Sequence, residues 1–586
     1  MSGSKTWPAG IPSPTDRRVA AVVAAWVEAA DTKNPAGAIS AVTTRVAEEM
    51  AIEVAVEVDG HTAPPSAAVL DVQVDGAVLR DAGPWLLGFT REALVSGRER
   101  RQEGVHHTTP AMAAALVEFV GRLRPFVGTD VIVDPSVGGG VFLLAVCDAL
   151  GGDRAGRLAQ VRGIDVDPLA IATAEASLRL WAGGAPLPAG ALRVGDALDD
   201  DWGFGEVEVV IGNPPFRSQL RDGTGRPGPR REELARRWPE LRGYVDDAAA
   251  FLLAGVDEVV DGGVVALVQP ASVLSARDAE AVRRRLLREA PPVGMWIDGG
   301  RQFSASVDTV ALVVEKGAEA PAAVARVRGV PTTDLADHPP IERASWASLL
   351  LVDSPVLQPG DTVASGTLAD VAHVTAGFRD QFYGLRGAVA EEGRDRHPKL
   401  ITSGLIDPLS CRWGEATCRF DKQRWTKPTV DVDAVDPAAR QWVRDRLVPK
   451  LLVASQTRIV EVVIDESADM VPCTPVITVE PRADAPSLAH LAAALTSPLA
   501  SLLLMNDAAG SALSADAMRV SARALGALPL PPLGAEWDAA ASAVNALGAA
   551  PTTDELDEIA QLSLAAYGMA DRLDVLNWWR SRRRDR

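Results

Sequence analysis

Short apolar runs alternate with helical patterns between about residues 103 and 317 of this 586-residue chain. The runs are rich in Val, Ile and Leu, end in turn residues, and lie at 131–135, 161–168, 207–215, 262–270, 293–300 and 308–317. Between them are helical patterns at 111–124, 140–150, 170–180, 248–260 and 276–288. Buried strands that alternate with helices are typical of an α/β fold, a doubly wound parallel sheet with helices on both faces. Ligands of such sheets bind at the carboxyl ends of the strands.

The rest of the chain is long enough for further domains, since one domain usually takes about 150 residues. We expect a helical or mixed region of open role at 1–102 and the sheet domain at 103–317. A linker rich in Ala and Pro is expected at 318–344. Short strands mixed with helices predict an α+β region at 345–535, and the last residues, 536–586, read as a helical segment with a basic tail.

Charge and hydropathy narrow the class of protein. The chain carries 59 basic and 78 acidic side chains, but the net charge of −19 describes only the far field and does not exclude a polyanion. The N-terminus lacks the apolar core of a secretory signal. The longest uncharged stretch, 485–506, contains His490 and Pro498 and predicts a buried helical layer rather than a membrane span. We therefore expect a cytoplasmic protein; four scattered cysteines give no expectation of a metal site.

The run at 131–135 leads into a glycine-rich turn, Asp134-Pro-Ser-Val-Gly138-Gly-Gly140, that precedes a helix. Glycines let the backbone approach a ligand closely, and the free N–H groups at a helix N-terminus create a positive potential. The Asp134 carboxylate suits an ammonium group. The turn alone is weak evidence, because a tight turn without a ligand uses the same residues.

Two further acids follow the next strands along the chain. Asp165 ends the run at 161–165, where an acid usually accepts hydrogen bonds from ribose hydroxyls, and Asp196 is placed to accept from an adenine amine. The turn does not match the phosphate-binding pattern GxxxxGK[ST], and no basic residue follows Asp165 directly. A ligand with an amine, a ribose and an adenine but no phosphate is S-adenosylmethionine rather than NAD or ATP.

The most specific signal is Asn213-Pro214-Pro215-Phe216 after the run VEVVIG. The two prolines stiffen the turn and keep Asn213 out of a helix. The rim then presents an amide oxygen and a backbone carbonyl, which together can bind both hydrogens of a planar exocyclic amine, while Phe216 can stack on the base. Positioning and electrostatic stabilisation are then sufficient for in-line methyl transfer without a metal.

The order of these motifs resembles that of class I S-adenosylmethionine-dependent N6-adenine DNA methyltransferases of the gamma class. That class includes restriction-modification enzymes and methylases of BREX-type phage defence. His107-Thr108-Thr109-Pro110 resembles the segment that precedes the glycine turn in the family. Over 103–317 the resemblance implies a Rossmann-like methyltransferase sheet in which Asn213, Pro214, Pro215 and Phe216 are catalytic. It also implies a cofactor site of Thr109, Pro110, Asp134, Gly138, Gly140, Asp165 and Asp196.

A basic loop follows the NPPF motif, with eight arginines and four acids in residues 217–242. Such a loop beside a site can contact DNA phosphates and support the strands when a base is flipped. The region 345–535 resembles, more weakly, the target-recognition domains of these enzymes, with TAGFRDQFYG at 375–384 and SQTRIVEVVID at 455–465. The expected DNA contacts are Arg217, Arg221, Arg226, Arg230, Arg379 and Arg458, with Gln381, Tyr383, Lys450 and Gln456 as further candidates.

The leading interpretation is a site-specific methyltransferase acting on the N6 amine of a flipped adenine in double-stranded DNA, in restriction-modification or phage defence. No fused nuclease is expected, so restriction would require a separate subunit. One alternative keeps the chemistry but makes the substrate RNA or a protein glutamine, where NPP-aromatic turns also occur. Another is a catalytically silent DNA-binding subunit of a defence complex, against which the intact NPPF and glycine motifs argue.

Overall fold

The computed structural model forms two compact units, Met1–Ala344 and Ser345–Arg586, which are described separately. In the first unit it describes residues 17–94, 108–199, 201–216, 228–243, 245–298 and 309–341 except 320 and 322. In the second it describes residues 345–377, 379–391, 397–508, 518–548 and 550–583, with breaks at 352–353, 356 and 358–359.

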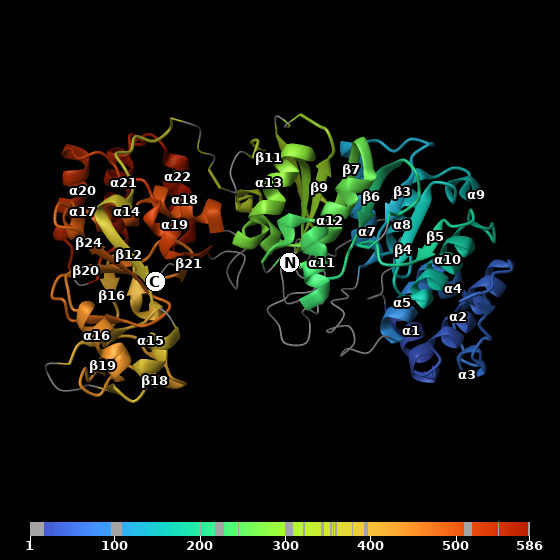
Figure 1. Cartoon of the computed structure of the whole chain (residues 1–586), viewed down its shortest axis with the longest axis horizontal. Helices are drawn as coiled ribbons and strands as arrows, with labels where there is room; N and C mark the ends of the chain where they lie inside the picture. Colours follow the sequence, from blue (N-terminus) through green and yellow to red (C-terminus); the bar gives the residue numbers. More distant parts are fainter. Residues whose placement is uncertain are drawn as a thin grey trace. The chain divides into compact units, whose positions relative to one another are not determined.

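A mixed sheet forms the centre of the first unit (Figure 1). Its strands lie in the order β11-β10-β8-β9-β7-β6-β3-β4-β5. The half that runs from β7 to β5 is parallel, as expected from the alternation of apolar runs and helices. These five strands are β3 (Ile132–Asp134), β4 (Val161–Asp165), β5 (Leu192–Val194), β6 (Val207–Gly212) and β7 (Val259–Pro270).

The other half of the sheet differs from a purely parallel arrangement. Strand β9 (Thr309–Glu315) is antiparallel to both β7 and β8 (Pro292–Ile297). A parallel pair needs a crossover of a dozen or more residues, usually a helix, and the connection from β8 to β9 is too short for one. The Rossmann-like sheet with helices around it is confirmed, but one strand in its middle is reversed.

Alternate residues of the central strands face opposite helical layers. Val209 and Ile211 of β6 belong to the same core cluster as residues of α7 (Pro110–Leu123) and α8 (Val141–Leu150). Val210 points the other way, since a Cβ on Gly255 of α12 (Asp247–Glu258) would lie 3.3 Å from its Cγ1. Helix α10 (Pro168–Trp181) packs against α8, β4 and β5.

Residues 318–344, expected as a linker, contribute two strands to the sheet instead. β10 (Val324–Arg328) pairs in parallel with β8, and β11 (Thr333–His338) pairs antiparallel with β10 at the sheet edge. The sequence did not reveal this hairpin for two reasons. It follows the Ala- and Pro-rich residues 318–323, and the alternating apolar pattern of β10 is only a few residues long. The chain passes to the second unit only after residue 344.

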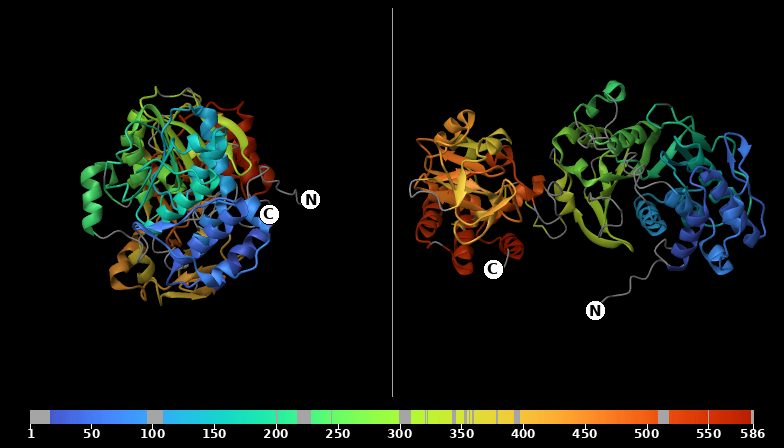
Figure 2. Two further views of the ribbon diagram at one scale, coloured as in Figure 1. Left: turned by 90° about the vertical axis from the view of Figure 1, so that its right-hand side faces the viewer. Right: turned by 90° about the horizontal axis from the view of Figure 1, so that it is seen from below.

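The N-terminal region joins the core of the sheet domain and is mainly helical. Its main helices are α1 (Arg17–Ala29), α2 (Pro35–Met50), α4 (Gly76–Ala82) and α5 (Trp85–Leu94). Helices α2 and α5 pack against α10, and their apolar residues share one hydrophobic cluster with the helices α7, α8 and α10 of the sheet domain. Figure 2 shows these helices, in blue, beside the cyan part of the sheet domain.

Two four-stranded sheets, three two-stranded ones and a group of helices make up the described part of the second unit. One four-stranded sheet has the order β12-β24-β20-β22 and the other β13-β19-β14-β23. The strands of the first are β12 (Ala372–Ala376), β24 (Ile477–Pro481), β20 (Lys450–Val453) and β22 (Val462–Asp465). Those of the second are β13 (Val389–Glu391), β19 (Pro428–Val430), β14 (Lys399–Ile401) and β23 (Met470–Pro472). This mixture of strands and helices is the α+β architecture expected for the C-terminal region.

The uncharged stretch forms two buried helices, α17 (Leu488–Thr496) and α18 (Pro498–Ala508). Both contribute to one core with α20 (Ala535–Asn545), α21 (Thr553–Ala566) and α22 (Leu573–Arg582), so the C-terminal helical segment is part of this unit. Among the described residues no single helix meets the length and hydropathy needed to cross a membrane. Only α17 and α18 together do so, as a pair bent by 59°.

Candidate active site

The glycine-rich turn connects β3 to α8 at the carboxyl edge of the sheet. Gly138 has φ +51° and Gly140 has φ +85°, both in the left-handed region that favours glycine. Gly140 is the residue before α8 and has no side chain to cap the helix. No side chain of the capping residue therefore covers the backbone N–H groups at this helix N-terminus. A ligand that lies close to the backbone requires this geometry.

Asp134 ends β3 next to this turn and is 1% exposed. Burial raises the pKa of its carboxyl to about 7; the Ser136 N–H, 3.0 Å from Oδ1, opposes the rise, and the charge of Asp165 adds to it. Gly212 at the end of β6 leaves room for this carboxylate, since a Cβ there would lie 2.5 Å from Oδ1. A cationic ligand group would favour the ionised form.

Asp165 ends β4 and faces the turn from the neighbouring strand. Its Oδ2 accepts a hydrogen bond from the Gly138 N–H at 2.9 Å, and its Oδ1 accepts one from the Asp167 N–H at 3.0 Å. Burial raises the pKa of Asp165, and the positive charge of Arg91 opposes the rise. Each carboxylate oxygen has a second lone pair, so Asp165 keeps acceptor capacity for ligand hydroxyls.

Asp196 follows β5 and forms an ion pair with an arginine that the sequence predicts to be a DNA contact. The Nη2 of Arg230 lies 2.9 Å from Asp196 Oδ2, and Arg230 also pairs with Asp199 and with Glu233. Its side chain is only 20% exposed. In the structure Arg230 therefore joins α11 (Gly228–Arg237) to the loop after β5 instead of presenting its charge to a phosphate.

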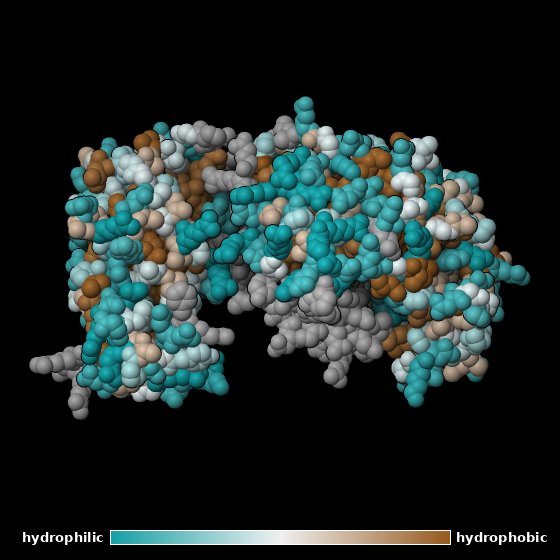
Figure 3. Space-filling model, in the orientation of Figure 1, coloured by the Kyte–Doolittle hydropathy of each residue, from teal (hydrophilic) through white to brown (hydrophobic). Residues whose placement is uncertain are grey.

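The outer face of α11 carries the exposed arginines of this segment. Arg231, Arg236 and Arg237 are exposed, and Arg237 also donates to the Leu198 carbonyl at 2.9 Å. Figure 3 shows hydrophilic side chains gathered over α11 and α13 (Glu280–Glu289). The predicted contacts Arg217, Arg221 and Arg226 lie outside the described residues.

The NPPF motif follows β6, directly beside the strand that carries Asp134. The Asn213 Nδ2 donates to Thr108 Oγ1 at 2.9 Å, which fixes the plane of the amide and thereby the place of its oxygen. Pro214 is buried, Asn213 and Pro215 are half-buried, and Phe216 is 9% exposed within the core cluster. Asn213 is thus a fixed group in the wall of the site.

Thr109 and Pro110 begin α7 close to this amide. Thr109 is the N-cap of the helix and accepts from the Met112 N–H at 3.3 Å, and Pro110 takes the first helical position. Both residues are buried, as is Thr108, which is 5% exposed. The segment places Thr108 against Asn213, so the predicted cofactor segment and the predicted catalytic motif meet in space.

Together these residues provide complementary groups for an adenosyl amino acid. Asp134 supplies a buried carboxyl for an ammonium group, and Asp165 supplies acceptors for ribose hydroxyls beside a turn without side chains. Asp196 has one carboxylate oxygen engaged by Arg230 and the other by the Leu198 N–H at 3.0 Å. Bound S-adenosylmethionine would supply an electrophilic methyl group; the chain's own residues supply orientation and charge.

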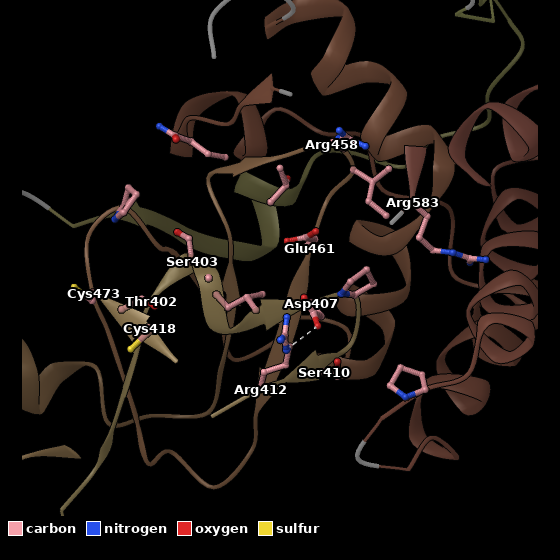
Figure 4. A pocket seen from close by; sticks show the side chains of 18 of the residues that line it. Thr402, Ser403, Asp407, Ser410, Arg412, Cys418, Arg458, Glu461, Cys473 and Arg583 are labelled. Carbon is pink, nitrogen blue, oxygen red and sulfur yellow. Dashed lines mark ion pairs between the residues drawn. The ribbon is translucent and has the colours of Figure 1, made fainter. Parts of the chain in front are cut away.

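A second concave site lies within the C-terminal unit (Figure 4). The cavity has a volume of about 840 Å³, and its lining includes five arginines against the two acids Asp407 and Glu461. Asp407 pairs with Arg412 across 3.8 Å from carboxylate oxygen to Nε. Hydroxyl groups of Thr402, Ser403 and Ser410 add hydrogen-bonding capacity. We call this site the basic groove; its arginines are Arg412, Arg419, Arg458, Arg582 and Arg583.

The DNA contacts predicted in this unit differ in whether their side chains are exposed or buried. Arg458 and Gln456 are exposed and line the basic groove. Lys450 is 0% exposed and forms an ion pair with the equally buried Asp465, so this candidate contact is wrong. All four residues of β20 are buried, and Asp465 of β22 lies opposite Lys450 in register. The side chain of Arg379 lies outside the described residues.

Several residues of the two sites have no signal in the sequence. In the sequence Thr108 is only a neighbour of Thr109, and Arg91 lies in a region of open role. The groove arginines 412, 419, 582 and 583 come from separate segments that only the fold brings together. A run such as Arg582-Arg583 at a chain end is equally typical of a solvated tail.

Residues 94–324 match the family model described as N-6 DNA Methylase. This part of the chain is similar to the N-6 DNA methylase family. The match spans the glycine turn, the strand-end acids and NPPF, and it supports a DNA methyltransferase. No curated protein matches the chain in sequence.

Several solved structures are similar to this chain. The type IIL restriction-modification enzyme MmeI, in complex with DNA, is 12% identical with a TM-score of 0.55, over 93% of this chain and 90% of that one. The type IIG restriction endonuclease BpuSI is 15% identical with a TM-score of 0.46, over 96% and 80%. A type I methyltransferase subunit from Streptococcus thermophilus is 20% identical with a TM-score of 0.34, over 47% and 57%. At these identities the likeness concerns the fold alone.

Proposed function

We propose that this methylase transfers a methyl group from S-adenosylmethionine to the N6 amine of an adenine flipped out of double-stranded DNA. The observation that carries the proposal is the fixed Asn213 amide, which is bonded to Thr108 and lies beside the glycine turn and the buried Asp134. An amide oxygen and a backbone carbonyl on a proline-stiffened turn are acceptors for the two hydrogens of an exocyclic amine. No covalent nucleophile is required.

The chain's residues would act by binding and orientation. Asn213 and the turn would hold the amine so that its lone pair points at the methyl group, and Phe216 would stack on the purine. As the N–C bond forms, the amine nitrogen becomes positively charged, and the acceptor oxygens stabilise that charge. The sulfonium sulfur leaves as a neutral thioether, and the extra proton of the product amine passes to solvent.

Target recognition is assigned to the C-terminal unit and its basic groove. Four of the five groove arginines, with several hydroxyls around 840 Å³, are suited to phosphates and base edges, against the sign of the chain's overall charge; Arg583 is instead bound to Asp557 and is 11% exposed. Arg458 and Gln456 retain their predicted role as DNA contacts. The structural likeness to MmeI, a restriction-modification enzyme bound to DNA, supports this assignment and a role in restriction-modification or phage defence. Such an enzyme acts in the cytoplasm, with any nuclease on a separate subunit.

Replacement of Asn213 tests the mechanism. We expect Asn213→Ala to lower transfer of a labelled methyl group to DNA about a hundredfold or more, because an acceptor of the developing charge is lost. Binding of S-adenosylmethionine, measured by calorimetry, should change little. Thr108→Val, which removes only the group that fixes the amide, should give a smaller loss. Unchanged transfer by the Asn213 variant would refute the mechanism.

A further inference from the structure

Helix α5 of the N-terminal region touches the glycine turn directly. A Cβ on Gly139 would lie 2.7 Å from the Cα of Gly88 in α5, so the two backbones are in contact at this point. A small cavity of about 20 Å³ between them is lined by Trp85, Gly88 and Glu92 on one side and by Thr108 and Gly139 on the other. The N-terminal region therefore forms a wall of the proposed cofactor site.

A chain of polar contacts runs from α5 to the residue proposed to bind ribose. Arg91 of α5 forms an ion pair with Asp167, whose own N–H donates to Asp165 Oδ1 at 3.0 Å. Asp165 in turn accepts from the Gly138 N–H of the turn at 2.9 Å. Asp167 is also the N-cap of α10, accepting from the Leu169 N–H at 2.9 Å. The side chain of Arg91 is 12% exposed and that of Asp167 is 42% exposed, so the pair is partly open to solvent on the side of the acid.

We propose that Arg91 is a positioning residue of the cofactor site, which holds Asp165 oriented and ionised for the ribose hydroxyls of S-adenosylmethionine. It would act through Asp167 and by its charge, without contact with the cofactor. The inference rests on the proposed function, because it assumes that cofactor. It also gives residues 1–102 a role, since Arg91 belongs to them and not to the sheet domain.

The test is the affinity of the full chain for S-adenosylmethionine, measured by calorimetry between pH 5.5 and 8.5. Arg91→Met should weaken binding about tenfold at neutral pH, as expected for the loss of a charged partner. Arg91→Lys keeps the charge and should recover most of the affinity. Arg80→Met is the matched control, because Arg80 pairs with Glu49 at the surface of the same N-terminal region.

The pH profile separates positioning from general support of the fold. Asp165 is faced by the charge of Arg91 from α5, by Asp167 at the start of α10 and by Asp134 of β3. Without Arg91, burial and the two acids raise the pKa of Asp165 further, so in an Asp134→Asn background, where Asp134 no longer titrates, binding should fail at a higher pH. Asp167→Asn keeps a capping side chain but removes a negative charge, and should move the same midpoint to lower pH.

The outcomes are distinct. Opposite shifts in the Arg91→Met and Asp167→Asn variants support the inference, and Arg91→Gln takes the place of Arg91→Met if that variant does not fold. Wild-type midpoints in both variants overturn it while leaving the proposed function intact. Failure of the wild-type chain to bind S-adenosylmethionine would instead overturn the proposed function, and this inference with it.

Discussion

The two units of the protein use arginine in different ways. Around the strand ends of the first unit, Arg91 and Arg230 are largely buried and bound to carboxylates. In the basic groove of the second unit, Arg419 and Arg458 are exposed, while Arg412 keeps only a loose pair with Asp407. The first arrangement orders a site, and the second leaves positive charge available to a polyanion. The position of an arginine in the sequence does not distinguish these roles, but the partners of its guanidinium do.

The second unit contains a fully buried ion pair between two neighbouring strands. Lys450 and Asp465 are both 0% exposed and paired across β20 and β22, and Asp465 also accepts from the Met470 N–H at 3.1 Å. Asp465→Ala should lower the free energy of unfolding of this unit by about 3–5 kcal/mol, since it leaves a buried ammonium without its partner. Urea denaturation measures the loss.

The exposed neighbour Glu466 provides the control for this variant. Glu466→Ala should leave the unfolding transition in place, and binding of S-adenosylmethionine by the first unit should survive in both variants. If the Asp465 and Glu466 variants are equally stable, the buried pair is not what holds these strands together.

The basic groove gives the next largest expected effect. Arg458→Ala should weaken binding to duplex DNA about tenfold and reduce the slope of log affinity against log salt by about one, because one phosphate contact is lost. Fluorescence anisotropy over a salt series measures both quantities. Arg230→Ala, measured in the same way without cofactor, should leave DNA affinity nearly unchanged, because its guanidinium is bound to Asp196 and Asp199. The reverse order of effects would break the contrast between the units.

The smallest expected effect is a pH dependence of cofactor binding in the first unit. Burial raises the pKa of Asp134 to about 7, so its negative charge is present above that pH and is lost as the pH falls. Affinity for S-adenosylmethionine should therefore decline by about tenfold per pH unit below 7 and level off above it. Asp134→Asn, which has no charge at any pH, should bind weakly without this decline, and a parallel decline in that variant would assign the titration elsewhere.

The sequence was most informative where a local pattern coincides with a strand end. The runs before Asp134, Asp165 and Asn213 are apolar and β-branched, and each stops at a turn residue, so the parallel half of the sheet and its ligand edge followed from periodicity. Which strand runs backwards did not, because the direction of β9 depends on a short connection rather than on its own residues.

Contacts between distant segments were beyond the reach of local patterns. Asn213 bonds to a threonine 105 residues earlier, and Arg91 pairs with an acid 76 residues later. Gly139 illustrates the same limit: its lack of a side chain suggested a ligand, but it is required at least as much by the backbone of α5. Lys450 could be placed only once its strand partner was known.

The central claim is that Asn213 directs a methyl group to adenine N6 in DNA. The most direct measurement is single-molecule sequencing of DNA from cells that express either the wild-type chain or Asn213→Ala. The account predicts N6-methyladenine at one recurrent sequence motif with the wild-type chain and none with the variant. Modification of cytosine instead, or an equal adenine signal from the variant, would contradict it.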